Sequence, residues 1–565
     1  MKLICHKISV LILAALFSTA VAGCGGSDST RAVDPDMSGQ SQQPEVLYSV
    51  GGLLEGLADG NSVVLLNNGS DDLTLTADGE FAFSSQLNDG DSYQVTVGTQ
   101  PDDCHCTVEN GSGTVAGADV TSVVVRCRRW TDPQDLADNI SPDGSRAEKP
   151  QVAVNDDGEA VLVWRQRYDG VSGHFRIFKA EYRNGQWSAP QDLADNISPY
   201  AFYADNPQVA INSRGDAVIV WQQYDNGRWQ IFKLECRNGS WEDPRYPVRL
   251  SLPGQHAYNP QVAVNDDGDV IVVWQQYNGG SPNRSQIFKA ERRNGLWLRP
   301  ADLDDNISPD GQNAQFPQVA INSRGDAVVV WQQYDGHYNQ IFKSERRNGT
   351  WTHPDNADLG DNISPDGQHA YHPQVAIAPG QEAVIVWEQR VSSLRQVVVV
   401  EYRDGSWSDF SYPLPVSQFG RNGNYYPQVA MNARGDAVVA WRQWDGANWQ
   451  IFRAEYRDGR WIRPDGPDDN ISPDGQDASA AQVAMDANGS AVIVWQQSDG
   501  GNDQIFRAEY RDGAWTEPVV LDANISPDGQ DATVPRVAVG ARGDAVIVWQ
   551  QSDGGDLQIF KSEYR

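Results

Sequence analysis

The sequence is short of basic residues and, after its first 23 residues, has no long apolar run. Its 565 residues include 44 Lys and Arg against 76 Asp and Glu, which gives a formal net charge of −32. A phosphate backbone binds clustered Lys and Arg, so this balance excludes nucleic acid as a partner and disfavours anionic membrane surfaces. No later apolar stretch approaches the length that crosses a membrane. The chain is also too long for one ordinary hydrophobic core.

The motifs of common enzyme classes are missing as well. We find no His-Glu-x-x-His, no Gly-x-Ser-x-Gly, no Walker A loop, and no Gly-x-Gly-x-x-Gly between a strand and a helix. The eight His residues form no pattern of metal ligands. Paired carboxylates for glycoside cleavage stay open, because the sequence contains many Asp residues whose separation in space it does not reveal.

The amino terminus carries an export signal. Residues 1–23 contain two lysines, an apolar run and then small residues, which is typical of a secretory signal peptide. Val21-Ala-Gly-Cys24 resembles the bacterial lipoprotein signal, and this resemblance implies cleavage before Cys24 and lipidation of its thiol. Gly25 stands where an inner-membrane retention signal has Asp, so the resemblance implies an outer-membrane or surface lipoprotein. A signal peptide cleaved elsewhere is the alternative. Residues 24–44 are rich in Gly, Ser, Asp and Gln and predict a flexible tether.

Residues 45–128 predict a small antiparallel β-sandwich, because short alternating strands are separated by Asp-Gly and Asn-Gly turns. The segments that begin Tyr48-Ser-Val-Gly-Gly and Cys106-Thr-Val-Glu-Asn-Gly resemble Ig-like modules near the start of bacterial surface lipoproteins. Such modules are typically spacers, so the resemblance implies a location and no chemistry.

The cysteines of this module suggest one cross-link. Cys106 and Cys127 are the pair that we expect to form a disulfide, since an exported domain of this size is stabilised by closing a loop. Cys104 and Cys236 are left over. A metal site at Cys104-His105-Cys106 is the alternative, although the second ligand pair of a structural zinc site is missing.

Tryptophan recurs every 54 to 57 residues beyond residue 129, and a second Trp series interleaves with the first. Each repeat predicts four short strands joined by tight turns. The second strand is apolar at consecutive positions, so both of its faces are buried, as in a small sheet between two like sheets. Four-stranded sheets stacked around an axis make a β-propeller. The two series are Trp130, Trp187, Trp241, Trp297, Trp351, Trp407, Trp461 and Trp515, and Trp164, Trp221, Trp274, Trp331, Trp387, Trp441, Trp495 and Trp549.

The phase of the repeats predicts how the propeller closes. Eight first strands predict eight blades. The region opens with a lone fourth strand at Trp130 and ends after a third strand at Arg565, so we expect both ends to share one blade, a 1+3 closure that removes free edges. A linear array is the alternative, but it would need capping repeats. The predicted fold is therefore all-β, with an eight-bladed β-propeller over residues 129–565 behind an Ig-like sandwich.

Residues that recur in every repeat are expected to be structural, because a catalytic group must differ from its copies. The Glu of the third strand, such as Glu181, and the Gln two residues after each second-strand Trp, such as Gln223, occur in all eight repeats. We expect ion pairs from the Glu and backbone hydrogen bonds from the Gln.

The loops between second and third strands and between blades lie on one end of the propeller, because successive strands alternate in direction. This end collects aromatic residues beside carboxylates, which suits the stacking and hydrogen bonding of sugars. The alternative is a solvated acidic rim of turn-forming Asp. Calcium is a further alternative, with Asp305 and Asp310 as weak candidates. The candidate ligand-binding residues are Tyr224, Asp225, Trp229, Tyr334, Asp335, Trp444, Asp445 and Trp449.

The repeat unit Pro-Gln-Val-Ala-Val-Asn, followed by an apolar strand, Trp-x-Gln and Ile-Phe-Lys-Ala-Glu, resembles sialidase-like propeller repeats of bacterial secreted proteins. The resemblance spans residues 130–565 and implies an exported propeller. The Asp boxes of true sialidases are missing, which argues against sialidase activity.

From these features we expect a non-catalytic outer-membrane or surface lipoprotein, monomeric and without a cofactor, that binds extracellular glycan or a protein through its loop face. A glycosidase or polysaccharide lyase of propeller fold is the first alternative, and an envelope assembly scaffold is the second. The fifth repeat departs from the others at Ala378-Pro-Gly380 and at 397–400, where Val replaces Ile-Phe-Lys.

Overall fold

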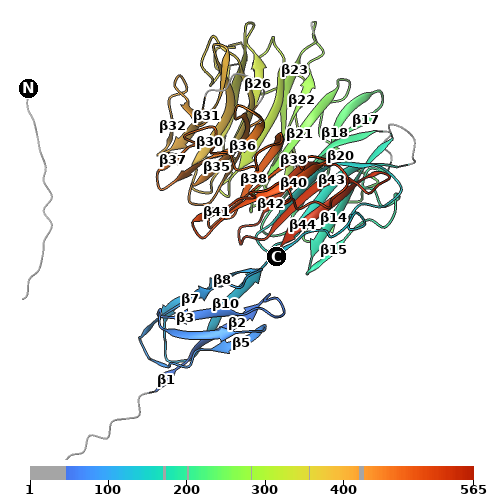
Figure 1. The fold of residues 1–565 in the computed structure, drawn as a ribbon. Helices are drawn as coiled ribbons and strands as arrows, with labels where there is room; N and C mark the ends of the chain where they lie inside the picture. Colours follow the sequence, from blue (N-terminus) through green and yellow to red (C-terminus); the bar gives the residue numbers. More distant parts are fainter. Residues whose placement is uncertain (1–45, 169–173, 200–202, 282, 356, 419–424) are drawn as a thin grey trace, which may run out of the picture.

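The computed structural model describes residues 46–168, 174–199, 203–281, 283–355, 357–418 and 425–565, and the regular elements of these residues are all β-strands (Figure 1). The expected all-β class is confirmed for this part of the chain. The predicted signal peptide, the tether and Cys24 lie outside the described residues. Within the described ranges, no helix is long and apolar enough to reach across a membrane.

Two four-stranded sheets form the N-terminal module. Its strands are β1 (Leu47–Tyr48), β2 (Val50–Glu55), β3 (Val63–Asn67), β4 (Asp71–Leu75), β5 (Gly79–Ala82), β6 (Leu87–Asn88), β7 (Ser92–Thr99), β8 (His105–Glu109), β9 (Ser112–Thr114) and β10 (Val120–Arg128). One sheet has the order β5-β2-β10-β8 and the other β4-β3-β7-β9, while β1 pairs with β6. Alternate side chains of both sheets point into a shared apolar core, as Val63 and Leu65 of β3 do.

The rest of the described chain forms eight sheets, which we number 1 to 8 in chain order. The first strands are β12 (Ala147–Val154), β16 (Ala204–Ile211), β21 (Ala257–Val264), β25 (Ala314–Ile321), β29 (Ala370–Ile377), β34 (Gln428–Met431), β38 (Ala478–Met485) and β42 (Ala532–Val539). The second strands are β13 (Ala160–Arg167), β17 (Ala217–Asp225), β22 (Val270–Tyr277), β26 (Ala327–Tyr334), β30 (Ala383–Val391), β35 (Ala437–Trp444), β39 (Ala491–Ser498) and β43 (Ala545–Ser552).

The outer half of each sheet is built from a long third strand and a short fourth strand. The third strands are β14 (Phe175–Arg183), β18 (Arg228–Arg237), β23 (Ser285–Arg293), β27 (Asn339–Arg347), β31 (Leu394–Arg403), β36 (Trp449–Arg457), β40 (Asp503–Arg511) and β44 (Leu557–Tyr564). The fourth strands are β15 (Gln186–Ser188), β19 (Ser240–Trp241), β24 (Leu296–Leu298), β28 (Thr350–Thr352), β32 (Ser406–Trp407), β37 (Arg460–Ile462), β41 (Ala514–Thr516) and, for sheet 8, β11 (Trp130–Thr131). Sheets 2 and 5 gain a fifth strand, β20 (Val248–Arg249) and β33 (Leu414–Pro415), which the sequence did not suggest.

The sheets close into a propeller-like ring. Each first strand contacts the first strands of both neighbouring sheets, and β12 contacts β42. The first strands therefore lie innermost. Sheet 8 has the order β11-β44-β43-β42, with Trp130 opposite Tyr564, so it joins the strand that follows the module to the last strand of the chain.

The second-strand Trp series forms the core between sheets. Each of these eight Trp side chains is fully buried and stacks on the Phe or Val of its own third strand, as Trp495 does on Phe506 with ring centroids 6.0 Å apart. Its indole N–H donates to the Gln two residues later; for Trp495 and Gln497 this distance is 3.1 Å. The Gln amide donates in turn to a loop carbonyl, that of Pro473, at 2.6 Å. The expected backbone bonding of this Gln is confirmed.

Six of the fourth-strand Trp residues link neighbouring sheets through the repeated Glu, whereas the indole nitrogens of Trp130 and Trp461 have no hydrogen-bond partner among the described residues. The indole N–H of Trp241 in sheet 2 donates to Glu181 of sheet 1 at 2.7 Å, and Lys179 and Arg183 form ion pairs with the same carboxylate. These cations hold the pKa of Glu181 below its usual value against the effect of burial, which raises it. The expected structural role of the repeated Glu is therefore confirmed.

Candidate functional site

The eight sheets differ from one another at a ring of positions near the axis. In each first-strand segment, the residue before the repeated Pro, or before Ala481 in sheet 7, has a positive φ between 47° and 58°. For a residue with a side chain this conformation costs on the order of 1 kcal/mol, and such strain often accompanies functional sites. We call these the bulge residues: Lys149, Asn206, Asn259, Phe316, His372, Tyr426, Ala480 and Val534.

A cross-sheet hydrogen bond from the bulge N–H holds four of the bulge residues in place: Lys149, Asn259, His372 and Val534. The backbone N–H of Val534 in sheet 8 donates to the side chain of Gln496, which follows Trp495 in sheet 7, at 3.1 Å. The same bond joins His372 to Gln332 at 3.4 Å. Between sheets 5 and 6 the acceptor is a carboxylate, because Glu388 replaces Gln and accepts the N–H of Tyr425 at 2.7 Å. All eight sheets thus share the positive φ of the bulge, while the cross-sheet bond and the side chains that are presented differ from sheet to sheet.

Neighbouring bulge side chains meet around the ring. Lys149 Nζ lies 2.8 Å from Asn206 Oδ1, and Asn206 Nδ2 lies 3.2 Å from Asn259 Oδ1. The bulge residues of sheets 1 to 3 therefore form one continuous polar arc, built from positions more than 50 residues apart in the sequence.

Sheets 5 and 6 bring a cluster of ionisable side chains to the ring. Glu388 is fully buried and forms an ion pair with Arg395. His372 points its Nδ1 at the same carboxylate, 3.7 Å away and beyond hydrogen-bond reach. The ring of Tyr426 lies 4.4 Å from the imidazole, centroid to centroid, and Arg442 lies over the Tyr426 ring at 5.3 Å.

Two polar atoms of this cluster are buried without a hydrogen-bond partner among the described residues: His372 Nδ1 and the hydroxyl of Tyr425. Burial, with a further contribution from Arg395, lowers the pKa of His372 to about 4, so its imidazole is neutral at pH 7. Burial raises the pKa of Tyr425 to about 12, so the phenol keeps its proton. Buried polar groups are normally satisfied, and unsatisfied ones near perturbed pKa values are typical of sites that bind a substrate.

Sheets 1 and 2 present a second charged cluster. Arg165 contacts two carboxylates at once, that of Asp205 at 2.9 Å and that of Glu148, whose ion pair with Arg165 is shorter. Lys149 lies 2.9 Å from Asp205. The two acids are therefore bridged by one guanidinium group, and their charges are compensated locally.

Sheets 7 and 8 present small side chains at the bulge and at the position before it, although Asp503 of sheet 7 stands where sheet 5 has Arg395. The bulge residues are Ala480 and Val534, and the residues before them are Ser479 and Thr533. The ring therefore has two charged clusters, at sheets 1 and 2 and at sheets 5 and 6, and small uncharged bulge residues at sheets 7 and 8, which lie between them.

The candidate ligand-binding aromatics lie at the hairpins between second and third strands. Tyr224 and Trp229 face each other with ring centroids 5.8 Å apart, and Trp444 and Trp449 do the same at 5.8 Å. Tyr224, Tyr334 and Trp444 are exposed. In sheets 2 and 3 the aromatics continue inward as a row in which neighbouring ring centroids lie 5.8 to 6.4 Å apart: Tyr203, Tyr224, Trp229, Tyr258 and Tyr277. Tyr258 precedes a bulge residue, so the row connects the rim to the ring.

The candidate carboxylates have local partners. Asp335 accepts the backbone N–H of Tyr338 at 2.6 Å, and Asp445 accepts that of Asn448 at 2.7 Å. Asp225 contacts Asn226 and Arg249. The first two carboxylates close their own turns, as the solvated-rim alternative describes.

The weak calcium candidates are also engaged locally. Asp305 accepts the N–H of Ala301 at 2.6 Å, and Asp310 accepts a hydrogen bond from Asn306 at 3.1 Å. Within the described ranges, the group of three or more metal-type ligands that lie together consists of Cys104, Cys106 and Cys127 and does not include either Asp.

The bulge residues were missed by the sequence analysis. A signal was present, because the residue before each repeated Pro varies while the sequence after it repeats. Only the ring closure shows that these variable positions meet.

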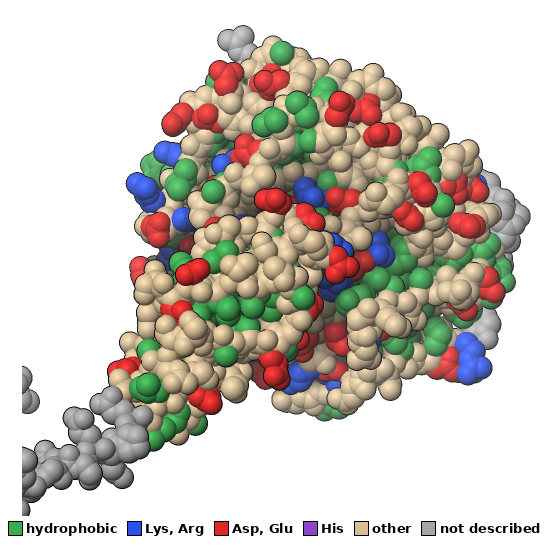
Figure 2. Space-filling view, turned by 60° about the horizontal axis from the view of Figure 1, so that its bottom comes forward, with side chains coloured by type: hydrophobic (Ala, Val, Ile, Leu, Met, Phe, Trp, Pro, Cys, Tyr) green, Lys and Arg blue, Asp and Glu red, His purple; other side chains and the backbone are tan. Residues whose placement is uncertain are grey.

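A cavity of about 980 Å³ lies at the opposite end of the ring, between the N-terminal module and the turns that follow the first strands. The face toward the module is hollowed, with Lys and Arg side chains inside and Asp and Glu around them (Figure 2). Its arginines have framework partners: Arg457 pairs with Glu455, Arg511 with Glu509, and Arg128 of the module with Asp544. Because these cations are compensated by the repeat itself, we place the candidate site at the bulge residues.

No protein-family model and no curated protein sequence matches the chain. Among solved structures, the chain is similar to a PL25 ulvan lyase bound to -[GlcA(1-4)Rha3S]-, with 8% identity, 69% of this chain and 99% of that chain covered, and a TM-score of 0.42. It is also similar to an α-L-arabinofuranosidase from Fusarium graminearum, with 14% identity, coverage of 55% and 93%, and a TM-score of 0.32. A protein of unknown function from Dyadobacter fermentans matches with 14% identity, coverage of 58% and 98%, and a TM-score of 0.36.

These neighbours correct the function expected from the sequence. A non-catalytic binder was expected, and this expectation is wrong, since the neighbours of assigned activity named here are a polysaccharide lyase and a glycoside hydrolase. The alternative of a glycosidase or lyase agrees better with them. At these identities and TM-scores the likeness does not extend to individual residues.

Proposed function

We propose that the protein is a carbohydrate-cleaving enzyme, with its active site at the charged cluster of sheets 5 and 6 and with a polysaccharide lyase as the favoured type. The observation that carries this proposal is the cluster of sheets 5 and 6, in which half-buried His372 and buried Tyr425 and Glu388 depart from the residues of the other repeats. In this proposal the eight sheets are the blades of an eight-bladed propeller with 1+3 closure.

The cluster has the groups that β-elimination needs. A lyase removes a proton beside a uronate carboxylate, stabilises the negative charge that develops, and returns a proton to the leaving oxygen. His372 is the proposed base, because its imidazole is neutral and its Nδ1 has no hydrogen-bond partner among the described residues. Arg395 and Arg442 are the proposed partners of the substrate carboxylate, and Tyr426 is the proposed acid.

The aromatic row of sheets 2 and 3 is the proposed binding surface for neighbouring sugars. Aromatic rings stack on the apolar faces of sugar rings, and a row that runs from rim to ring suits an extended chain. Substrates with several sugar units are therefore expected to bind better than single sugars.

A glycosidase is the second candidate, and the acid pair of sheets 1 and 2 favours it. Glu148 and Asp205 are bridged by Arg165, and two carboxylates across a sugar are the usual hydrolytic pair. In this case Glu148 and Asp205 would carry the chemistry, and His372 would not.

The test is to incubate the purified protein with a panel of uronate-containing and neutral polysaccharides. A lyase produces new reducing ends together with the ultraviolet absorbance of unsaturated uronate, whereas a hydrolase produces reducing ends alone. If neither product forms on any member of the panel, the proposal of an enzyme is rejected.

We also propose that the protein is anchored by lipid at Cys24 in the outer membrane or at the cell surface, with an Ig-like N-terminal module as a spacer. The motif Val21-Ala-Gly-Cys24 supports the anchor, and the two facing sheets support the module type. Labelling with palmitate should mark the protein and should be lost in the variant Cys24→Ser.

A further inference from the structure

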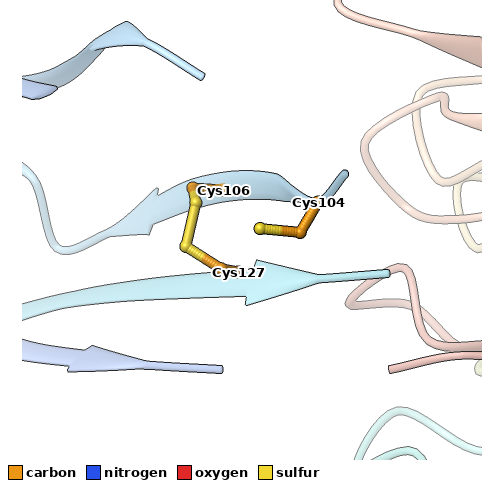
Figure 3. A group of neighbouring side chains, drawn as sticks. All are labelled: Cys104, Cys106 and Cys127. Carbon is orange, nitrogen blue, oxygen red and sulfur yellow. A yellow bond between two sulfur atoms is a disulfide. The ribbon is translucent and has the colours of Figure 1, made fainter. Parts of the chain in front are cut away.

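A free cysteine lies against the disulfide of the N-terminal module. Cys106 and Cys127 are bonded across β8 and β10, the pair that the sequence favours, and Cys104 is buried beside them as a free thiol. The three sulfur atoms all lie within 4.8 Å of one another (Figure 3). Cys104 and Cys106 are two residues apart on extended backbone, so both side chains face Cys127.

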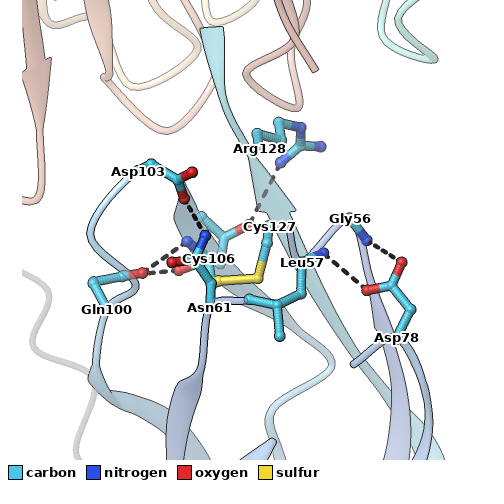
Figure 4. The surroundings of a disulfide bond; sticks show 10 residues. Gly56, Leu57, Asn61, Asp78, Gln100, Asp103, Cys106, Cys127 and Arg128 are labelled. Atoms are coloured by element: carbon cyan, nitrogen blue, oxygen red, sulfur yellow. Dashed lines mark hydrogen bonds between the residues drawn. A yellow bond between two sulfur atoms is a disulfide. The ribbon is translucent and has the colours of Figure 1, made fainter. Parts of the chain in front are cut away.

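The surroundings hold this arrangement in place. Gln100 accepts the backbone N–H of Cys106 at 2.7 Å and donates to its carbonyl at 2.9 Å (Figure 4). Asn61 donates to Asp103, which fixes the residue before Cys104. The thiol is therefore kept beside the disulfide by the fold of the module.

We propose that Cys104, Cys106 and Cys127 form an intramolecular thiol–disulfide exchange site. The Cys104 thiolate attacks Cys127 Sγ, a Cys104–Cys127 bond forms, and the Cys106–Cys127 bond breaks. The electron pair leaves on Cys106 Sγ, which takes up the proton that Cys104 released. One thiol and one disulfide exist before and after the step, so no oxidant or reductant is needed.

The geometry selects Cys127 as the sulfur that is attacked. A bond between Cys104 and Cys106 would join two residues of one extended segment, whose Cα atoms are separated by about 6.6 Å, near the upper end of the range for disulfides. Cys127 lies on the neighbouring strand, where a diagonal partner two residues along is within reach.

The exchange would act at the junction between the module and the ring. His105, between the two competing cysteines, has its Nε2 3.5 Å from Asp512 of sheet 7. Arg128, next to Cys127, has its Nε 3.1 Å from Asp544 of sheet 8. A change of disulfide partner therefore alters the strand ends that contact the ring.

The rate of exchange should depend on pH. Burial and the neighbouring Asp103 raise the pKa of the Cys104 thiol, while the backbone at Ala58 and the charge of Arg129 act in the opposite direction. Because the thiolate is the attacking species, exchange should be slow at neutral pH and faster in alkaline solution.

The experiment locates the free thiol in the full chain, purified without reductant. Samples held at neutral and at alkaline pH are quenched in acid and denatured with an acid-active alkylating reagent, and the label is assigned by tandem mass spectrometry. Label should move from Cys104 to Cys106 with time, at least tenfold faster in alkaline solution. Cys236, which lies in the ring with Arg183 as its neighbour, reports complete labelling in every sample. Label that stays on Cys104 at all times and pH values would overturn the proposal.

Cysteine variants test the proposal without relying on the rate of exchange. Cys106→Ser should form the Cys104–Cys127 bond on air oxidation, so that Cys236 is labelled while Cys104 and Cys127 are not, whereas labelled Cys104 and Cys127 in a folded variant would contradict the proposal. Cys104→Ser should show no label on Cys106 at any pH, and Cys236→Ser should behave as the wild type. Circular dichroism confirms that each variant has folded.

Discussion

Sheets 5 and 6 and sheets 7 and 8 share one framework but differ in the side chains that surround the bulge. Both pairs keep the buried Trp, the Gln that binds its indole, and the bulge with positive φ. At the bulge level, sheets 5 and 6 present His372, Tyr425 and Glu388, whereas sheets 7 and 8 present Ser479, Ala480, Thr533 and Val534. In a repeat protein the repeated residues therefore report on folding, and the departures from the repeat report on function.

Removal of a buried second-strand Trp should lower the free energy of unfolding equally in both pairs of sheets. Trp495→Ala in sheet 7 removes a fully buried indole, its stacking on Phe506 and the partner of Gln497. We expect a loss of about 5 kcal/mol in the free energy of unfolding, at the upper end for such changes. Trp387→Ala in sheet 5 should lose a similar amount. Denaturant unfolding measures both losses. If one loss were less than half of the other, the frameworks of the two pairs of sheets would not be equivalent.

The side chains at the bulge should affect catalytic activity in sheets 5 and 6 only. His372→Ala should lower kcat/KM on the polysaccharide substrate on the order of 10³-fold, the usual loss for a general base. The control is Ala480→Ser, at the same bulge position of sheet 7, which should leave kcat/KM unchanged. Equal activity in both variants would remove His372 from the mechanism and favour the acid pair of sheets 1 and 2.

Restoring the repeat should separate folding from activity. Glu388→Gln puts back the residue of the other repeats and keeps an acceptor for the N–H of Tyr425, but it removes the ion pair with Arg395 and the carboxylate that faces His372. We expect a folded protein with kcat/KM reduced about 10²-fold. The reverse change, Gln496→Glu in sheet 7, serves as the control and should leave activity intact. Full activity in Glu388→Gln would contradict the proposed role of this carboxylate.

Acid should destabilise the cluster of sheets 5 and 6 through His372. The pKa of His372 is about 4 in the folded protein and about 6.5 in an unfolded chain. The unfolded chain therefore binds a proton first, so the contribution is complete above pH 6.5 and is lost as the pH falls toward 4. The loss should be about 3 kcal/mol. The comparison is between the wild type and His372→Gln, unfolded by denaturant at a series of pH values, and identical pH profiles would count against the buried neutral imidazole.

The cross-sheet hydrogen bond should have a small effect wherever it is cut. Gln496→Ala removes the acceptor for the N–H of Val534 and should lower the free energy of unfolding by about 1 kcal/mol. Gln332→Ala, which frees the N–H of His372, should lower it by the same amount and should also reduce activity a few-fold, because the bulge carries the proposed base. An effect on activity in Gln496→Ala but not in Gln332→Ala would reverse the assignment of the active side.

The architecture could be predicted because the same sequence motifs recur in every repeat. Eight copies of Trp-x-Gln and seven of the Asn-Gly or Asp-Gly turn predict strand number, turn type and the phase of the closing sheet. The site could be predicted only in part. The aromatics Tyr224 and Trp229 were chosen by type, and they pair as expected. His372 contacts Glu388 and Tyr426 because the bulge and the neighbouring sheet bring these positions together. A single sequence without relatives does not reveal such contacts.

The shared sheet also sets the order in which the ring can assemble. Trp130 pairs with Tyr564, so the ring is sealed by contacts between the two ends of its sequence. Joining ends this far apart costs about 2 kcal/mol more chain entropy than closing a single repeat. Sheets 1 to 7 can each form from adjacent segments, but β11 has no partner until β44 has emerged from the ribosome and folded. The chain thus carries an unpaired strand edge until β44 pairs with β11. During that time the edge can pair with other chains and misassemble.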